Sequence, residues 1–168
     1  PGAPTPEGIF DRAKVAIANY EFPDPKLISA IYDPSQELDG RNMLLRAQFA
    51  GMTFFFGVRV SRVIDEERKN EAGNDTKMWG YAYRTLQGHY EIGEITFVVK
   101  KDLVTGEVSF YIDAYSKPDK IPNLIHRLGF KLLGRPIQRY YARSSLDRMK
   151  EITRRGGREI AGVDRKRP

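Results

Sequence analysis

The stretch MWGYAYRTL, residues 78–86, decides the fold because the character of its side chains alternates along the chain. Successive side chains of a β-strand point to opposite faces, so Trp79, Tyr81, Tyr83 and Thr85 share one face. Aromatic and β-branched residues are typical of strands. The stretch therefore predicts a strand that presents an aromatic row to one side of a sheet.

Two further alternating stretches follow, residues 94–103 and 107–115. Ile95 and Phe97 share one face of the first, and Phe110 and Ile112 share one face of the second. The short connection Val104-Thr105-Gly106 favours a tight turn. These residues predict a β-hairpin directly after the aromatic strand.

The chain before residue 78 also reads mostly as strands. Residues 43–49 and 52–64 are rich in aromatic and branched residues and are joined by Ala50-Gly51, which predicts two paired strands. Residues 27–32 predict a short strand. Residues 65–77 are polar and predict an exposed loop.

Helices are expected at both ends of this strand-rich region. Thr5 is a candidate N-cap with Pro6 at the first helical position, and Pro23 ends the first helix. The second helix is predicted to start at Asp119. Its apolar stripe consists of Ile121, Leu124, Ile125, Leu128 and Leu132.

Gly134 and Pro136 interrupt that second helical pattern. Proline removes a main-chain donor, so we expect a kink or break there and a second helical stretch from Ile137 to about Arg154. The inward residues of this stretch are predicted to be Ile137, Tyr141, Met149 and Ile152.

The order of elements predicts an α+β fold, in which a curved antiparallel sheet grips a long C-terminal helix and an N-terminal helix precedes it. Residues 1–155 are expected to form a single domain, and residues 156–168 a basic flexible tail. The edges of such a sheet diverge from the helix, so we expect a cavity between the two.

Composition excludes several kinds of site. The 168 residues include no cysteine, which rules out disulfides and thiolate ligands, and the two histidines, His89 and His126, cannot make a multi-histidine metal site. No cofactor and no metal are therefore expected. No run approaches the roughly 18 apolar residues of a membrane span. The lack of cysteine fits a cytoplasmic protein.

The net charge of +6 is unevenly distributed. Residues 119–168 hold 14 basic and 5 acidic residues, whereas residues 1–118 hold 14 basic and 17 acidic ones. Five basic residues recur every four positions and would form one ridge on a continuous helix: Arg127, Lys131, Arg135, Arg139 and Arg143. This ridge is a candidate site for nucleic-acid phosphates or an anionic membrane, although no nucleic-acid module is recognisable. The alternative is a solvated outer helix face opposite the apolar stripe.

Acid–base chemistry has one candidate site. His89 titrates near neutral pH, Glu94 could orient it or act as the acid, and Tyr81 could donate to an oxyanion. The alternative is structural: Gly88-His89 forms a turn and Glu94 pairs with Arg84 across the strands. If Ile95 and Phe97 face the core, Glu94 points away from it.

The aromatic face is the candidate ligand-binding surface. Its proposed lining comprises Trp79, Tyr81, Tyr83, Phe97 and Phe110. Amphipathic rings can hold an apolar guest and orient it through their polar tips. The alternative is that these rings are ordinary core residues.

Two motifs carry a resemblance to a known family. GYAYRTLQGHYEIGEITF at residues 80–97 and AYSKP at residues 114–118, with Gln138-Arg139-Tyr140 farther on, resemble the family labelled domain of unknown function nineteen-ninety. The likeness covers most of the chain beyond about residue 8. The resemblance implies a START-like helix-grip fold related to the birch-pollen-allergen superfamily. It implies no substrate and no catalytic residue, but it directs attention to the Gly88-to-Glu94 block.

Three functions remain open at this point. The leading hypothesis is a small binding protein for a hydrophobic or aromatic molecule, lipid-like or polyketide-like, held between the sheet and the C-terminal helix. The second is a cofactor-free enzyme in the same cavity, such as a cyclase, hydrolase or dehydratase. The third is binding of an anionic polymer or membrane surface by the basic C-terminal third. The oligomeric state is left open.

Overall fold

The computed structural model describes residues 1–49, 51–86, 91–118 and 124–154. Within these residues, two helices flank six strands in the order of the chain. The elements are α1 (Ile9–Ala18), β1 (Ile28–Ile31), β2 (Asn42–Phe49), β3 (Met52–Lys69), β4 (Asp75–Thr85), β5 (Glu91–Asp102), β6 (Val108–Pro118) and α2 (Leu124–Arg154). The protein is therefore α+β, as the sequence predicts.

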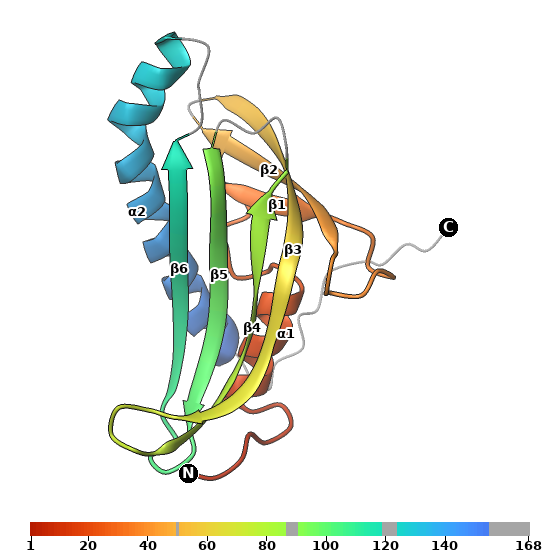
Figure 1. The fold of residues 1–168 in the computed structure, drawn as a ribbon, viewed down its shortest axis with the longest axis vertical. Helices are drawn as coiled ribbons and strands as arrows, with labels where there is room; N and C mark the ends of the chain where they lie inside the picture. Colours follow the sequence, from red (N-terminus) through yellow and green to blue (C-terminus); the bar gives the residue numbers. More distant parts are fainter. Residues whose placement is uncertain (50, 87–90, 119–123, 155–168) are drawn as a thin grey trace.

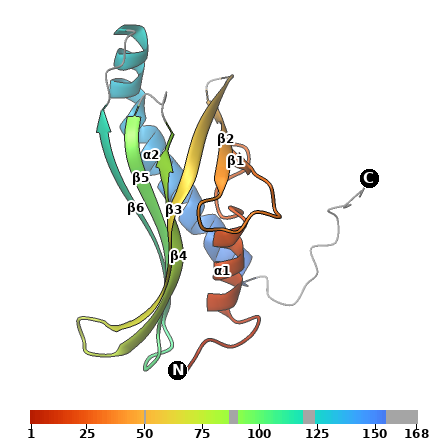
Figure 2. The same cartoon turned by 45° about the vertical axis from the view of Figure 1, so that its right-hand side comes forward.

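The six strands form one antiparallel sheet in which each strand pairs with the next along the chain. The sheet is curved, and both helices lie on its inner side (Figures 1 and 2). In Figure 1, α1 lies toward the lower end of the sheet, and the start of α2 lies at the upper end together with the end of β2 and the start of β3. These two ends are called lower and upper below.

Side-chain alternation separates the two faces of the sheet. Tyr81 lies opposite Phe97, and Trp79 lies opposite Val99, so these four side chains point inward together. They are buried and belong to one hydrophobic core with Phe10, Ala13 and Ile17 of α1. Burying such side chains contributes roughly 1.5–3 kcal/mol each. The core thus joins α1 to the lower half of the inner face.

The second half of α2 is held against α1. Arg12 Nε donates to the carbonyl oxygen of Thr153 at 2.9 Å, and Arg148 Nε donates to that of Glu21 at 2.8 Å. Met149 is buried in the common core, as predicted for an inward residue, and Ile152 is half-buried against it. These contacts fix α2 on the inner side of the sheet.

Strands β3 and β4 are longer than the sequence predicts. The polar residues 65–69 and 75–77 continue the ladder, so the loop between the strands is only residues 70–74. Lys69 pairs with Asp75 at the end of the ladder, with Nζ and Oδ1 2.9 Å apart. Lys77 reaches Asp65 across the same ladder, with Nζ and Oδ1 2.8 Å apart. Opposite charges facing each other stabilise a two-stranded extension that hydropathy alone does not indicate.

The start of α1 differs from the prediction. Gly8 is the N-cap, with no side-chain hydrogen bond, and Thr5 lies one turn earlier, where its carbonyl oxygen accepts the Gly8 N–H at 3.0 Å. Residues 5–8 therefore form a separate turn. The helix starts only where apolar residues begin to contact the sheet.

Of the kink or break predicted at Gly134 and Pro136, the break is wrong. Helix α2 is continuous from Leu124 to Arg154. A proline removes one main-chain hydrogen bond of a long helix while those on either side remain. The predicted helix start at Asp119 and the tail at residues 156–168 lie outside the described residues. In the described part of the chain, neither helix has the length and apolar character needed to cross a membrane.

Candidate functional site

The predicted ligand-lining residues lie on the inner face. Trp79, Tyr81, Tyr83 and Phe97 are buried, and Phe110 is half-buried. They share this face because they alternate with outward residues on three adjacent strands. The prediction that they lie together on one face is confirmed.

Most of these rings are covered by the segment around the end of α1. The Phe22 ring centroid lies 4.8 Å from that of Phe97 and 5.3 Å from that of Phe110. The Tyr20 ring lies 6.0 Å from that of Phe97 in an edge-on arrangement. Such close contacts between aromatic rings are typical of a packed protein core. A guest can therefore approach this interior only from the part of the inner face that lies above these rings.

The upper inner face is apolar but incompletely covered. Phe54 and Phe56 share this face on β3, and their parallel rings lie 6.4 Å apart. Phe54 is 38% exposed, and Ile95 and Ile112 are half-buried on the neighbouring strands. Figures 1 and 2 place the first half of α2 at this same end. The upper inner face is therefore a partly open apolar surface that continues from the packed core.

A cluster of buried hydroxyl groups separates the packed and open parts. The hydroxyl oxygens of Tyr20 and Tyr141 lie 3.4 Å apart, which joins the end of α1 to α2. Tyr83 interacts with Tyr20, and Tyr81 lies nearby on the same strand. We call Tyr20, Tyr81, Tyr83, Tyr141 and Ser145 the hydroxyl cluster.

The tyrosines of this cluster are neutral at physiological pH. Burial raises the pKa of Tyr20 and of Tyr81 well above the ordinary value, and neighbouring phenols add to both rises. Burial raises the pKa of Tyr83 to about 12, although its bond to Tyr20 acts in the opposite direction. Burial also raises the pKa of Tyr141. The cluster therefore offers O–H donors rather than phenolates.

Two hydroxyls of the cluster have no hydrogen-bond partner within the described residues. They are Tyr81 Oη and Ser145 Oγ, and both residues are fully buried. Ser145 Oγ lies beside Tyr141 but not at hydrogen-bonding geometry. A buried polar group without a partner costs roughly 1–3 kcal/mol. Such groups are uncommon in folded proteins and mark places where water or a ligand can be bound.

Arg41 lies at the edge of this cluster, just before β2. Its Nη1 donates to the carbonyl oxygen of Ala18 at 3.3 Å, and its Nη2 donates to that of Gln36 at 2.7 Å. Its guanidinium carbon lies 4.7 Å from the ring centroid of Tyr32. Its Nε is buried and, among the described residues, has no acceptor. The positive charge acts on Tyr81 from this position and opposes the rise of the Tyr81 pKa that burial causes.

Glu94 does not share this interior site. It lies opposite Arg84 in the β4–β5 ladder and therefore on the outer face. Arg84 Nε donates to its Oε2 at 2.6 Å, and Ser61 Oγ donates to the same oxygen at 3.1 Å. Partial burial acts to raise the pKa of Glu94, but these hydrogen bonds and the charges of Arg84 and Arg62 outweigh it and lower the pKa.

The predicted acid–base group is thus divided between two faces. Tyr81 points inward and Glu94 outward, so the structure does not bring these two together. His89, the third member, lies outside the described residues. The pairing of Glu94 with Arg84, which the sequence offered as the structural alternative, is present.

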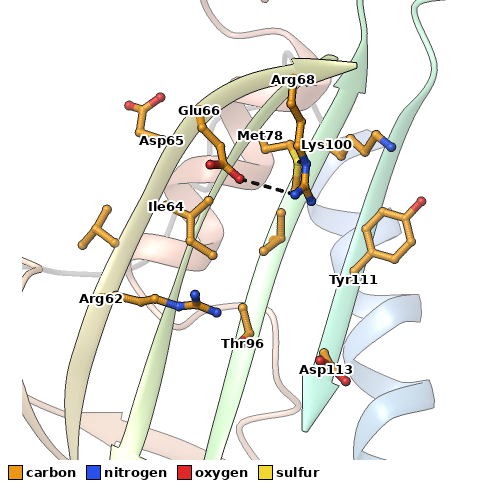
Figure 3. Close-up of a pocket in the computed structure, with 12 residues that line it drawn as sticks. Arg62, Ile64, Asp65, Glu66, Arg68, Met78, Thr96, Lys100, Tyr111 and Asp113 are labelled. Atoms are coloured by element: carbon orange, nitrogen blue, oxygen red, sulfur yellow. Dashed lines mark hydrogen bonds and ion pairs between the residues drawn. The ribbon is translucent and has the colours of Figure 1, made fainter. Parts of the chain in front are cut away.

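The outer face carries an open hollow of about 690 Å³. Its floor includes Thr96 and Val98 beside Gly80, and its rim combines basic and acidic side chains, as Figure 3 shows. On this rim, Arg68 Nη1 and Glu66 Oε1 are 3.8 Å apart, and the dashed line in Figure 3 marks this ion pair. The mixture of charges gives the hollow no strong preference for one sign of ligand.

The predicted basic ridge is described only in part. Arg139 and Arg143 are exposed on α2. The side chains of Arg127, Lys131 and Arg135 lie outside the described residues. Within the described residues, no three His, Asp or Glu side chains come close enough together to hold a metal ion.

Sequence reasoning missed several residues of the interior site. Phe22 follows the first helix in a loop, and Arg41 precedes a strand, so neither belongs to a periodic pattern. Ser145 is a small polar residue on an amphipathic helix. Phe54 and Phe56 could have been assigned to one face, because residues two apart on a strand share a face.

Comparison with known proteins gives one match. The model of a family described as Domain of unknown function (DUF1990) matches residues 2–148. No curated protein matches the chain, and no solved structure matches it.

Proposed function

The chain belongs to the family of the domain of unknown function DUF1990, and we propose that it binds a hydrophobic or aromatic small molecule against the upper inner face of its sheet. The match covers residues 2–148, which include all six strands, α1 and most of α2. The family description names no ligand. The proposal therefore depends on the chemistry of the interior alone.

One observation carries the proposal: the inner face is apolar along its length, but only its lower part is fully covered. Phe54 keeps 38% of its surface exposed although it points to the same side as the core. Ile95 and Ile112 are half-buried beside it. A contiguous exposed apolar surface beside polar groups is typical of ligand-binding sites.

The expected gain in free energy is sufficient for binding. An aromatic guest that removes roughly 200 Å² of apolar surface from water gains about 5 kcal/mol before the cost of association. A lipid-like or polyketide-like molecule offers at least this area. The fully packed region around Phe22 and Phe97 stays closed to it.

A pair of phenylalanines provides a matched test. Phe54 and Phe55 are adjacent on β3 and point to opposite faces, with exposures of 38% and 57%. Titration with the neutral dye Nile red would measure binding by fluorescence. We expect Phe54→Ser to weaken binding by about tenfold, because roughly 50 Å² of lost contact is worth about 1.3 kcal/mol.

Phe55→Ser is the control and should leave dye affinity unchanged. Equal weakening by both substitutions would place the dye elsewhere and contradict the proposal. Thermal unfolding of both variants checks that each remains folded.

Catalysis in the same interior and anion binding by α2 have weaker support. Glu94 lies outside the interior, which removes one of the two described groups proposed for acid–base work. Arg139 and Arg143 are exposed, as a solvated helix face also requires. Small-molecule binding is therefore the function that the described residues favour.

A further inference from the structure

Three buried hydrogen-bond donors around the end of α1 lack acceptors among the described residues. They are the Tyr81 hydroxyl, the Ser145 hydroxyl and the Nε–H of Arg41. Tyr81 and Ser145 have 0% relative exposure. Three donors without a partner among the described residues, from β4, α2 and the segment before β2, point to a missing acceptor rather than to one strained side chain.

The other groups nearby do not supply this acceptor. The hydroxyls of Tyr20 and Tyr141 are close to each other, and Tyr20 also interacts with Tyr83. The remaining nitrogens of Arg41 donate to the carbonyl oxygens of Ala18 and Gln36. Because burial keeps the Tyr81 phenol protonated, its hydroxyl remains available as a donor at neutral pH.

These donors adjoin the open apolar surface. Tyr83 lies opposite Ile95 in the β4–β5 ladder. This pair is two residues along β4 from the pair formed by Tyr81 and Phe97, toward the upper end of the sheet. The apolar surface at Phe54, Phe56 and Ile95 therefore leads down to the hydroxyl cluster. A guest that entered from the upper end would meet hydrocarbon first and hydrogen-bond donors last.

We propose that the ligand of the upper inner face carries a hydrogen-bond-accepting oxygen, a carbonyl or carboxylate, at its inner end, and that Tyr81 and Ser145 donate to it. This inference rests on the proposed function and adds the chemical class and the orientation of the ligand. Arg41 lies close enough to act electrostatically on Tyr81, so it favours an oxygen with partial or full negative charge. An apolar body follows the oxygen toward Phe54.

Three naphthalene probes that differ only in one substituent can distinguish the contribution of the apolar body from that of the accepting oxygen. The probes are 2-methylnaphthalene, with no acceptor, 2-acetylnaphthalene, with a carbonyl, and 2-naphthoate, with a carboxylate. Affinities would be measured by fluorescence at pH 7 for the full chain. We expect at least one oxygen-bearing probe to bind about tenfold more tightly than the hydrocarbon, since a hydrogen bond in a buried site contributes roughly 1–1.5 kcal/mol.

Tyr81→Phe tests the donor directly. It should remove most of the advantage of the oxygen-bearing probe and leave 2-methylnaphthalene binding unchanged. Ser145→Ala should act in the same direction. Tyr111→Phe is the matched control, because Tyr111 is exposed on the outer face and its substitution should change no affinity. A preference for 2-naphthoate over the ketone would assign a full negative charge to the ligand.

The outcomes distinguish this inference from the function on which it rests. Equal binding of all three probes to the wild type, or an undiminished oxygen advantage in Tyr81→Phe, overturns the inference and leaves apolar binding in place. Absence of binding by any probe overturns the proposed function, and the inference with it. Thermal unfolding of each variant confirms that the comparison is made on folded protein.

Discussion

Tyr81 and Glu94 lie on opposite faces of the ladder formed by β4 and β5. Glu94 pairs with Arg84, which is three residues after Tyr81 on β4. Tyr81 is fully buried, and its hydroxyl has no partner among the described residues, whereas Glu94 accepts hydrogen bonds from Arg84 and Ser61 on the outer face. Because side chains alternate along each strand, the ion pair of Arg84 and Glu94 lies on the outer face of the sheet, and the hydroxyl cluster lies on the inner face. The proposed ligand binding depends on the donors of the inner face.

The unpaired hydroxyl of Tyr81 predicts that its removal stabilises the ligand-free protein. Tyr81→Phe keeps the ring and deletes a buried donor that lacks a partner among the described residues, so the free energy of unfolding should rise by roughly 1–2 kcal/mol. Urea denaturation monitored by tryptophan fluorescence would measure it.

Tyr20→Phe is the control with the opposite sign. Its hydroxyl lies 3.4 Å from that of Tyr141, so deletion loses a hydrogen bond and should lower the free energy of unfolding by about 1 kcal/mol. A loss of stability in Tyr81→Phe would mean that this hydroxyl is paired in solution.

The buried tyrosines also predict sensitivity to alkali. Burial raises the pKa of Tyr20, Tyr81, Tyr83 and Tyr141 above the unfolded value of 10.0. A tyrosine whose pKa is higher in the folded than in the unfolded protein contributes to the free energy of unfolding below pH 10. This contribution is lost as the pH rises toward the pKa of the folded protein. The loss is about 1.4 kcal/mol per pH unit for each such group.

Tyrosinate absorbance during an alkaline titration would test this expectation. The absorbance of these four residues should appear together with unfolding, and Tyr81→Phe should reduce the slope of stability against pH above 10. Ionisation of all nine tyrosines before unfolding would contradict the burial of the cluster.

The close packing at Gly80 predicts that adding a single methyl group there strongly destabilises the protein. A Cβ at this position would clash with the carbonyl oxygen of Phe97 and would lie 2.9 Å from the Cα of Val98, both main-chain atoms. Gly80→Ala should therefore force β4 and β5 apart and destabilise the protein by about 3 kcal/mol or more.

Gly57→Ala is the matched control for this substitution. Its added Cβ would meet Leu86 Cδ1 at 3.3 Å, and a side-chain end can move aside. Thermal unfolding of both variants should show a much larger decrease in Tm for Gly80→Ala. Similar decreases would argue against the close approach of β4 and β5.

Much of the fold could be predicted from the sequence because its strands alternate regularly. The aromatic row of β4 and the hairpin of β5 and β6 follow from residue character, and Gly106, with φ of +83°, occupies the turn between them. The polar extension of β3 and β4 could not be predicted from hydropathy. It depends on pairs such as Lys77 with Asp65 that form only across the ladder.

The interior site was harder to predict than the fold. Its members come from the end of α1, from the segment before β2, from β4 and from α2, and no spacing in the chain relates them. Tyr81 could be identified as inward from alternation. Its lack of a partner, and that of Ser145, depends on packing that only the structure shows.

Asp102 predicts a loss of stability in acid. The N–H groups of Thr105 and Val104 and the side-chain amide of Asn74 donate to its carboxylate, and together they lower its pKa to about 2 from 3.8. Because its pKa is lower in the folded protein, the Asp102 carboxylate contributes to the free energy of unfolding above about pH 4. This contribution is lost as the pH falls toward 2. Asp102→Asn should flatten this loss in urea denaturation between pH 6 and pH 2 when compared with the wild type. Parallel curves for the two proteins would contradict the role given to this carboxylate.

The location of a bound guest is the most direct test of the account. Two-dimensional NMR of isotope-labelled protein would be recorded during titration with 2-acetylnaphthalene. The account predicts that signals of the inner-face residues Phe56, Ile95 and Ile112 shift with the probe, while those of the outer-face residues Val98 and Tyr111 do not. Shifts confined to the outer hollow, or no shifts at all, would contradict it.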